Sequence, residues 1–287
     1  VDARIALGAF AFSVIAWTVL RLDDTPVALV AGLALIGLGV TKAEHFHASL
    51  GHSLIWLLIG AFVLAAVLQQ SGVAERWALR AVSGAGTVQH LLVRLTWVIS
   101  ATVFVVPSTS GRAALLLPLF LVLARTIADA RITRALALLF PTVILLSAGA
   151  SLLGAGAHLV AVDFMHTLGH QAPSFIGWAW LAAPFAIGSC FIATALIGRL
   201  FLNHEERQRG LALPRPERSA WSPQQKSVAL ITLLAVAAWA STAWHGIDAT
   251  SIALVAALLA TCKPLTGIDM KAALKKVEWN LILFLAA

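Results

Sequence analysis

Long apolar runs separated by short polar segments dominate the chain. An eighth run begins near Val277, and the seven before it lie at 5–20, 26–41, 53–69, 135–162, 174–201, 227–244 and 249–262. A helix needs about 20 residues to cross the hydrocarbon of a bilayer. The pattern therefore predicts an all-α polytopic membrane protein.

Two regions do not fit simple spans. In the segment 86–125, the second half is only 15 residues long and carries Pro118, which favours a re-entrant helical hairpin that enters and leaves on one side. The segment 74–83 before it alternates charged and apolar positions like a helix lying at the interface. The run 135–162 is too long for one straight helix, and its glycines predict a broken helix over 132–165.

The charged residues indicate a direction in the membrane. Only 11% of residues are charged and the mean hydropathy is +0.90, whereas soluble domains average about a quarter charged. With 86–125 re-entrant, every Lys and Arg lies on the cytoplasmic side except Arg4 and Lys42, which lie outside, and Arg112, which lies within the membrane. This is the positive-inside pattern. The net charge of +7 thus follows from topology, and we expect no nucleic-acid partner.

An internal repeat is visible in the apolar runs. "VALVAGLAL" (Val27–Leu35) resembles "IALVAALLA" (Ile252–Ala260), and "LIWLLIGAFVLAA" matches "VEWNLILFLAA" so that Trp56 aligns with Trp279. The copies are an odd number of crossings apart, so they are inverted, as in many secondary transporters. We expect a first repeat over 1–202, a cytoplasmic linker over 203–225 and the start of a second repeat over 226–287 that continues beyond Ala287. The first repeat would contain scaffold helices over 3–72, the interfacial helix, the hairpin, the broken helix and a helix over 174–202.

Polar residues gather at two breaks in the apolar region. The first is "PSTSGR" (Pro107–Arg112) and the second is "SAGASLLGAGAHL" (Ser147–Leu159). Helix ends leave free carbonyls on one side of a break and free N–H groups on the other. Carbonyls with hydroxyls suit a hard cation such as Na⁺, whereas N–H groups with hydroxyls suit a carboxylate. Two facing breaks predict a binding site near the bilayer midplane.

These residues resemble a known family. "STSGRAALLLP" resembles the hairpin-tip motif of the divalent anion–sodium symporter family, in which a Ser-Asn-Thr triplet precedes a run ending in Leu-Pro. The arginine two residues after the triplet is similar to that of its di- and tricarboxylate carriers, and "GASLLGAGAHL" resembles the family's second break. The resemblance covers nearly the whole chain. It implies an elevator transporter, often a homodimer, with Na⁺ as coupling ion and no other cofactor.

The combined analysis names the candidate site residues. For the substrate they are Ser108, Thr109, Ser110, Gly111, Arg112, Ser151 and His158. For the cation they are Ser108, Thr109, Gly149 and Gly154.

Alternatives stay open for several of these residues. An intramembrane arginine without a nearby acid points to an anionic ligand, but Arg112 could instead cap hairpin carbonyls. The hydroxyls of 108–110 could simply satisfy the turn, and His158 could be a hydrogen-bonded core residue or a proton carrier. Cys190 and Cys262 lie in apolar runs as small core residues, and the histidines of 45–52 are poorly spaced for a metal centre.

We therefore expect a non-enzymatic, multi-pass inner-membrane protein. Its function would be secondary transport of a small di- or tricarboxylate, coupled to Na⁺ or by exchange. One alternative keeps the fold but moves other cargo, by arsenite export or Na⁺/H⁺ antiport, although neither break contains Asp or Glu. A second alternative is a membrane-embedded hydrolase or a non-transporting membrane protein.

Overall fold

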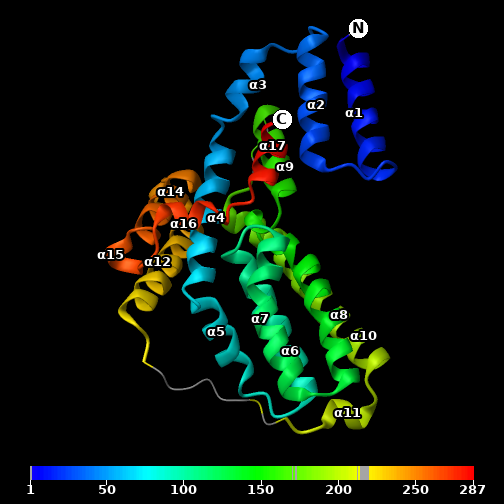
Figure 1. Ribbon diagram of the computed structural model, residues 1–287, viewed down its shortest axis with the longest axis vertical. Coiled ribbons are helices and arrows are strands. Elements are labelled where there is room, and N and C mark those ends of the chain that lie inside the picture. Colours follow the sequence, from blue (N-terminus) through cyan, green and yellow to red (C-terminus); the bar gives the residue numbers. More distant parts are fainter. Residues whose placement is uncertain (1, 170, 172, 212, 214–219) are drawn as a thin grey trace.

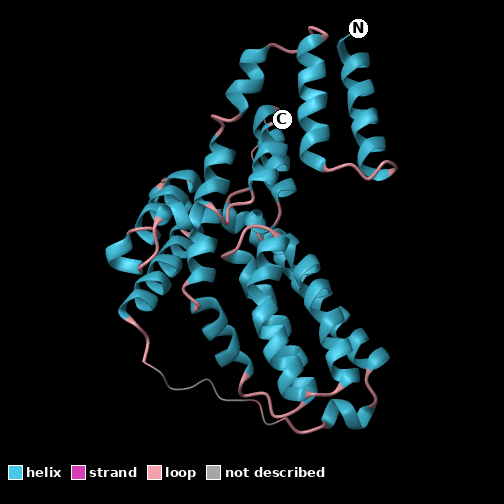
Figure 2. Ribbon diagram, in the orientation of Figure 1, coloured by secondary structure: helices cyan, strands magenta, loops and turns pink. Residues whose placement is uncertain are grey.

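The computed structural model describes residues 2–169, 171, 173–211, 213 and 220–287. All elements of these residues are helices, and one isolated bridge between Thr87 and Gly210 is their only strand-like pairing. The all-α prediction is confirmed (Figure 2).

The helices fall into three stretches of the chain. The first holds α1 (Asp2–Thr18), α2 (Asp24–Gly37), α3 (Ala43–Ser49), α4 (Ser53–Gln70) and α5 (Val73–Val82). The second holds α6 (Val88–Ala101), η1 (Thr102–Phe104), α7 (Thr109–Ile127), α8 (Ala130–Ser147), η2 (Ala148–Ala150), η3 (Leu152–Gly154), α9 (Gly156–Thr167), α10 (Phe175–Phe201) and α11 (His204–Gln208). The third holds α12 (Pro223–Ala240), α13 (Thr242–His245), α14 (Ala249–Ala260), α15 (Lys263–Thr266), α16 (Met270–Leu274) and α17 (Trp279–Ala286).

Four helical stretches of the described residues are long and apolar enough to cross a bilayer: Ala43–Gln70, Thr109–Ile127, Ala130–Ala150 and Phe175–Phe201. One of these is α7, which has 19 residues and continues through Pro118. The argument that the second arm of the hairpin is too short to span was therefore wrong. The helix can continue because a membrane helix tolerates a proline where its surroundings satisfy the carbonyl that the proline leaves free.

The two arms of the predicted hairpin are the helices α6 and α7, and both pack on α8. That this pair is re-entrant stays a prediction. The start of α6 and the end of α7 both lie at the lower end of Figure 1, and the tip that joins them lies near the middle. The base is closed by the segment after α11, since Val88 N donates to Arg209 O at 3.2 Å. Arg209 also pairs with Asp129 at 2.8 Å, just past the end of α7. Hydrogen bonds from the backbone N–H groups of Ile132 and Arg131 and the nearby Arg209 hold the pKa of Asp129 below its usual value.

The helices pack in two groups, joined through α5 and through a contact between α10 and α12. In one group, α6, α7 and α10 pack on α8, and α11 packs on α6. In the other, α14 packs on α4 and α12, and α15 and α16 pack beside them. The α4–α14 crossing is close, because a Cβ on Gly60 would lie 2.8 Å from the backbone of Ala253. Small residues of this kind allow membrane helices to approach each other.

The pairing of α2, α4, α14 and α17 is reciprocal. α2 packs against α17, and α14 packs against α4. In the sequence repeat, α2 matches α14 and α4 matches α17, so each of these contacts maps onto the other. A two-fold axis between inverted copies would generate this pairing. The inverted repeat itself stays a prediction.

Labelling of single cysteines tests the re-entrant topology. Gln89 near the start of α6 and Thr126 near the end of α7 are both exposed. With Cys190 and Cys262 replaced by alanine, we expect Gln89→Cys and Thr126→Cys to react with a membrane-impermeant maleimide from the cytoplasmic side only. Glu44→Cys should react from the outside and serves as the control. Reaction of the two hairpin cysteines from opposite faces would contradict the topology.

Candidate functional site

The two polar breaks lie against each other. Residues of η1, which precedes the hairpin tip, contact both η2 and η3 of the interrupted helix α8–α9. The contact depends on Gly154, because a Cβ there would lie 2.0 Å from Ala148 O and 2.8 Å from Val103 Cγ2. No side chain fits at that distance, so only glycine allows the second break to fold back against the first.

Arg112 joins the two breaks. Its side chain is fully buried, with 0% of its surface exposed. Its Nε donates to Thr102 Oγ1 at 3.1 Å, and its terminal nitrogens donate to Ile144 O at 3.0 Å and Ile99 O at 3.3 Å. A further hydrogen bond reaches Ser147 Oγ. Ile99 lies in the last turn of α6 and Ile144 in the last turn of α8, so the guanidinium lies between the negative ends of two helix dipoles.

These contacts correct the premise that Arg112 lacks a fixed protein partner. Its partners are carbonyls and hydroxyls at the ends of two helices, which sequence spacing does not bring together. The geometry therefore favours the capping alternative for this residue. It makes Arg112 a positioning residue that fixes the first turn of α7, because direct contact with an anion would compete with hydrogen bonds already made. Direct contact of Arg112 with the substrate stays the untested alternative.

The hairpin tip is built around Ser108. Ser108 is the N-cap of α7, and its Oγ accepts a hydrogen bond from Gly111 N at 3.0 Å. Its backbone has φ 97° and ψ 140°, a conformation that non-glycine residues rarely adopt and that costs on the order of 1–3 kcal/mol. The backbone N–H groups of Thr109 and Ser110 begin the helix and have no intrahelical partner. The tip thus presents N–H groups and the positive end of α7.

A carboxylate already lies at this tip. Ser108 Oγ donates to Glu278 Oε1 at 2.6 Å, and a Cβ on Gly111 would lie 3.7 Å from the same oxygen. Glu278 comes directly before α17 and is half-buried. The sequence analysis missed it and stressed that neither break contains an acid. The available signal was an acidic residue within the repeat match "VEWNLILFLAA", but nothing in the sequence placed it at the tip.

The starts of α7 and α17 meet at this point, since Glu278 directly precedes α17 and bonds to Ser108, the N-cap of α7. The start of α9 lies against the side of α17, where a Cβ on Gly156 would lie 3.3 Å from Leu285 Cδ1 and 3.7 Å from Leu281 Cδ1. Figure 1 shows α9 and α17 adjacent above the hairpin tip. Each helix start contributes about half a positive charge to its surroundings. The region is thus suited to hold negative charge, and Glu278 supplies some of it.

The other candidate residues take local roles in the structure. Ser110 is exposed and Thr109 is half-buried at the tip. Ser151 is fully buried, and its Oγ accepts from Leu153 N at 3.3 Å. His158 is half-buried, and its Nδ1 lies 3.1 Å from Ser151 O. This contact matches the hydrogen-bonded-histidine alternative.

The predicted cation ligands Gly149 and Gly154 lie in the second break. The carbonyl of Gly149 accepts a hydrogen bond from Trp178 Nε1 at 3.0 Å, so one of its two lone pairs is already used. Cation binding at Ser108, Thr109, Gly149 and Gly154 stays a prediction. Within the described part of the chain, no group of three or more His, Cys, Asp or Glu could hold a metal ion.

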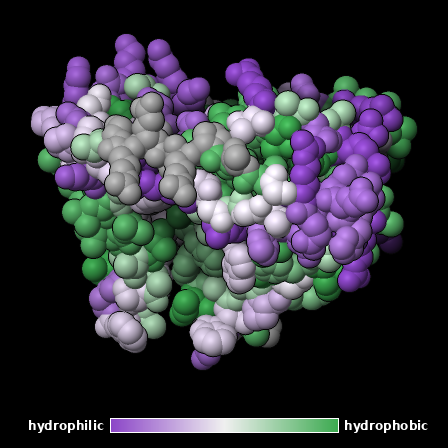
Figure 3. Space-filling model, turned by 90° about the horizontal axis from the view of Figure 1, so that it is seen from below, coloured by the Kyte–Doolittle hydropathy of each residue, from purple (hydrophilic) through white to green (hydrophobic). Residues whose placement is uncertain are grey.

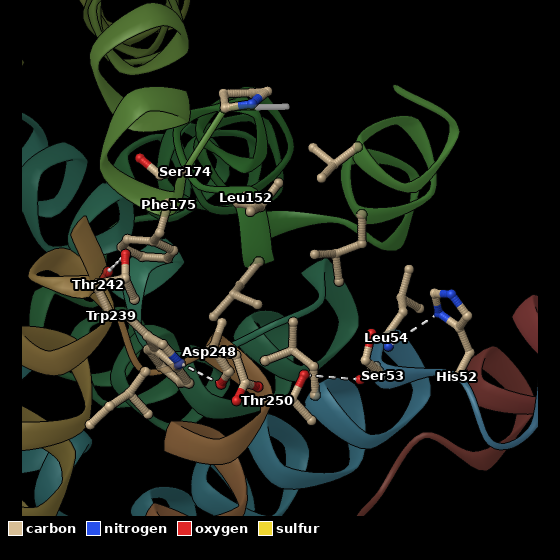
Figure 4. A pocket seen from close by; sticks show the side chains of 17 residues that line it. His52, Ser53, Leu54, Leu152, Ser174, Phe175, Trp239, Thr242, Asp248 and Thr250 are labelled. Atoms are coloured by element: carbon tan, nitrogen blue, oxygen red, sulfur yellow. Dashed lines mark hydrogen bonds between the residues drawn. The ribbon is translucent and has the colours of Figure 1, made fainter. Parts of the chain in front are cut away.

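A pocket of about 290 Å³ lies beside the second break, against η3. Leu152 and Leu153 of η3 form one wall, and Trp239 and Phe175 form another. Figure 4 shows polar side chains around it, which are His52, Ser53, Ser174, Thr242, Asp248 and Thr250. Thr250 Oγ1 donates to Ser53 O at 3.1 Å and ties α14 to α4 at its edge. The pocket gives space beside the second break.

A family model described as "Citrate transporter" matches residues 12–287. The match includes both breaks and Glu278. No curated protein matches the chain.

Substitution of Arg112 tests its role in holding the breaks. Arg112→Gln cannot make all four hydrogen bonds, and each buried group left without a partner costs about 1–3 kcal/mol. We expect a clearly lower thermal unfolding midpoint in detergent, without any substrate present. Arg125→Gln, an exposed arginine on the same helix, should leave the midpoint unchanged. An unchanged midpoint for Arg112→Gln would show that the guanidinium does not support the fold.

Proposed function

The chain belongs to the citrate transporter family, and on that premise we propose that it carries a di- or tricarboxylate such as citrate by secondary active transport, with one substrate carboxylate bound at the N-terminus of α7. The membership agrees with the resemblance to carboxylate carriers. It makes the chain a membrane transporter of carboxylate-type anions and not an enzyme.

The observation that carries the proposed site is the carboxylate of Glu278 on Ser108 Oγ at 2.6 Å. A site that accepts one carboxylate from the protein has the donors that a substrate carboxylate needs. These are the Ser108 hydroxyl and the free N–H groups of Thr109 and Ser110, at the positive end of α7. Exposed Ser110 leaves the tip open to an incoming anion.

In the proposed site the hairpin tip, Arg112 and Glu278 have three different roles. The tip hydroxyls and N–H groups bind the substrate carboxylate, and charge-assisted hydrogen bonds make that binding strong. Arg112 keeps the first turn of α7 aligned with the ends of α6 and α8, and its positive charge also favours an anion nearby. Glu278 repels a second carboxylate, so a substrate displaces it from Ser108 as it binds.

The two packing groups support an elevator mechanism. The hairpin, α8 and α10 form one packed group, while α4, α12 and α14 form another. Few helix pairs connect the groups, and α5 contacts both α4 and the hairpin. We propose that the first group moves with the substrate against the second, within a homodimer in the inner membrane. Sliding of rigid bundles around a fixed site is the common form of alternating access.

Two ions are candidates for coupling to anion transport, Na⁺ and the proton. Ser108, Thr109, Gly149 and Gly154 offer the oxygens that Na⁺ prefers, as the family resemblance implies. A specific observation favours the proton instead: Glu278 places a titratable carboxylate at the tip. Intramembrane carboxylates commonly carry protons in transporters. Protonation would release Glu278 from its charge conflict with the substrate and link proton entry to anion binding.

Uptake into proteoliposomes tests the binding site. We expect Ser108→Ala to weaken citrate or dicarboxylate uptake affinity by about tenfold or more, because a hydrogen bond to a charged group is worth about 1.5–3 kcal/mol. Ser222→Ala removes another N-cap serine, one that accepts from Gln225 N at 3.1 Å far from the tip, and should keep the parent affinity. Equal uptake affinities for the two variants would contradict the proposed binding role of Ser108. If the parent protein takes up no carboxylate, the proposed transport function is wrong.

Glu278→Gln distinguishes the coupling ions. If the proton is coupled, parent uptake rises as external pH falls, and Glu278→Gln abolishes that dependence while Glu205→Gln, an exposed control on α11, keeps it. If Na⁺ is coupled, uptake requires a sodium gradient and its pH dependence is the same in all three proteins. A loss of pH dependence in Glu205→Gln as well would rule out a special role for Glu278.

A further inference from the structure

A second polar site lies away from the breaks, where α6, α10 and α11 meet. A pocket of about 270 Å³ opens there. Its polar end is formed by Gln89, Arg199 and Arg207, and its inner wall by Leu92, Val93, Phe191, Thr194, Ala195 and Gly198. The proposed transport mechanism uses none of these residues.

The two arginines carry charge that the described part of the chain does not neutralise. Two carboxylates in this part of the chain pair with other arginines: Glu206 pairs with Arg131 at 3.2 Å, and Asp129 pairs with Arg209 at 2.8 Å. Arg207 donates only its Nε, to Asn203 O at 3.4 Å. Within the described residues, Arg199 and Arg207 form no ion pair. Among the described residues, the pocket therefore has a positive mouth that no ion pair neutralises.

An apolar surface continues from the pocket. Val93 and Trp97 of α6 and Ile192, Leu196 and Leu200 of α10 are exposed. Trp97 packs edge-on against Phe191, with ring centroids 4.9 Å apart. Seen from below, hydrophilic and hydrophobic side chains both show on the lower end of the molecule (Figure 3), where Figure 1 places α11. In a membrane protein such a face lies against acyl chains, and the arginines mark its interface with the headgroups.

A buried hydrogen bond joins the two helices that line the pocket. Thr96 and Thr194 form a buried hydrogen bond of 2.6 Å between α6 and α10. This bond holds α6 and α10 together beside the pocket, which Thr194 lines.

We propose that this pocket binds the phosphate headgroup of an anionic phospholipid, with one acyl chain along the exposed apolar face of α6 and α10. Arginine recognises a phosphate through paired N–H donors, and basic pockets between membrane helices on the cytoplasmic side bind anionic lipid headgroups. Gln89 adds an amide donor at the mouth. A lipid bound there covers the seam between α6 and α10 and neutralises the two arginines.

The test compares lipids that differ only in the headgroup. The purified protein is titrated with phosphatidylglycerol or phosphatidylcholine of the same acyl chains, and binding is read from native mass spectrometry and from the thermal unfolding midpoint. We expect phosphatidylglycerol to bind and raise the midpoint, and phosphatidylcholine not to. The double substitution Arg199→Gln and Arg207→Gln should weaken phosphatidylglycerol binding by about thirtyfold. This converts to about 2 kcal/mol, or about 1 kcal/mol for each basic residue beside an anionic headgroup.

A matched control removes two positive charges elsewhere. Lys271→Gln with Lys275→Gln changes exposed residues at α16, remote from the pocket, and should leave phosphatidylglycerol binding unchanged. Three results would overturn the proposal: full phosphatidylglycerol binding by the arginine double variant, an equal loss in the lysine double variant, or an equal midpoint shift by inorganic phosphate at the same concentration. The last result would identify a plain anion site instead of a lipid site.

Discussion

The structure depends on one buried cation between two helix ends. α6 and α8 both stop inside the apolar region, and their last carbonyls have no helical partners. Leaving such groups unsatisfied in a membrane costs several kcal/mol each. Arg112 supplies donors to Ile99 and Ile144 in those last turns and lies between both negative dipole ends. The charge and the two breaks therefore stabilise each other, and neither would be tolerated alone.

The function proposed for the tip follows from the same constraint. A helix that ends at a break leaves carbonyls, and the helix that begins there leaves N–H groups. Arg112 covers the carbonyl side, so the N–H side at Ser108 remains for an anion. Glu278 shows the kind of group that this side accepts. At this break the carbonyl groups bond to the Arg112 guanidinium and stabilise the fold. The N–H groups at the start of α7 are the proposed binding groups.

Local patterns predicted most of the helices. The break before α7 and the interruption between α8 and α9 follow from proline, glycine and serine positions, whose effects act over a few residues. The partners of Arg112 did not follow, because Ile144 lies 32 residues away on another helix. Glu278 could not be placed either, since its hydrogen bond to Ser108 spans 170 residues. The sequence suggested Gly154 as a cation ligand. In the structure a glycine is required there for a steric reason, because Ala148 and Val103 leave no room for a Cβ.

The most direct test of this account is an experimental structure of the protein with a bound citrate or dicarboxylate. The account predicts density for a substrate carboxylate within hydrogen-bond distance of Ser108 Oγ and of the N–H groups of Thr109 and Ser110. It also predicts that Glu278 has left Ser108 and that the Arg112 guanidinium still contacts Ile99 and Ile144. A guanidinium that has turned away from those carbonyls to grip the substrate would contradict the central claim that Arg112 holds the breaks and the tip holds the anion.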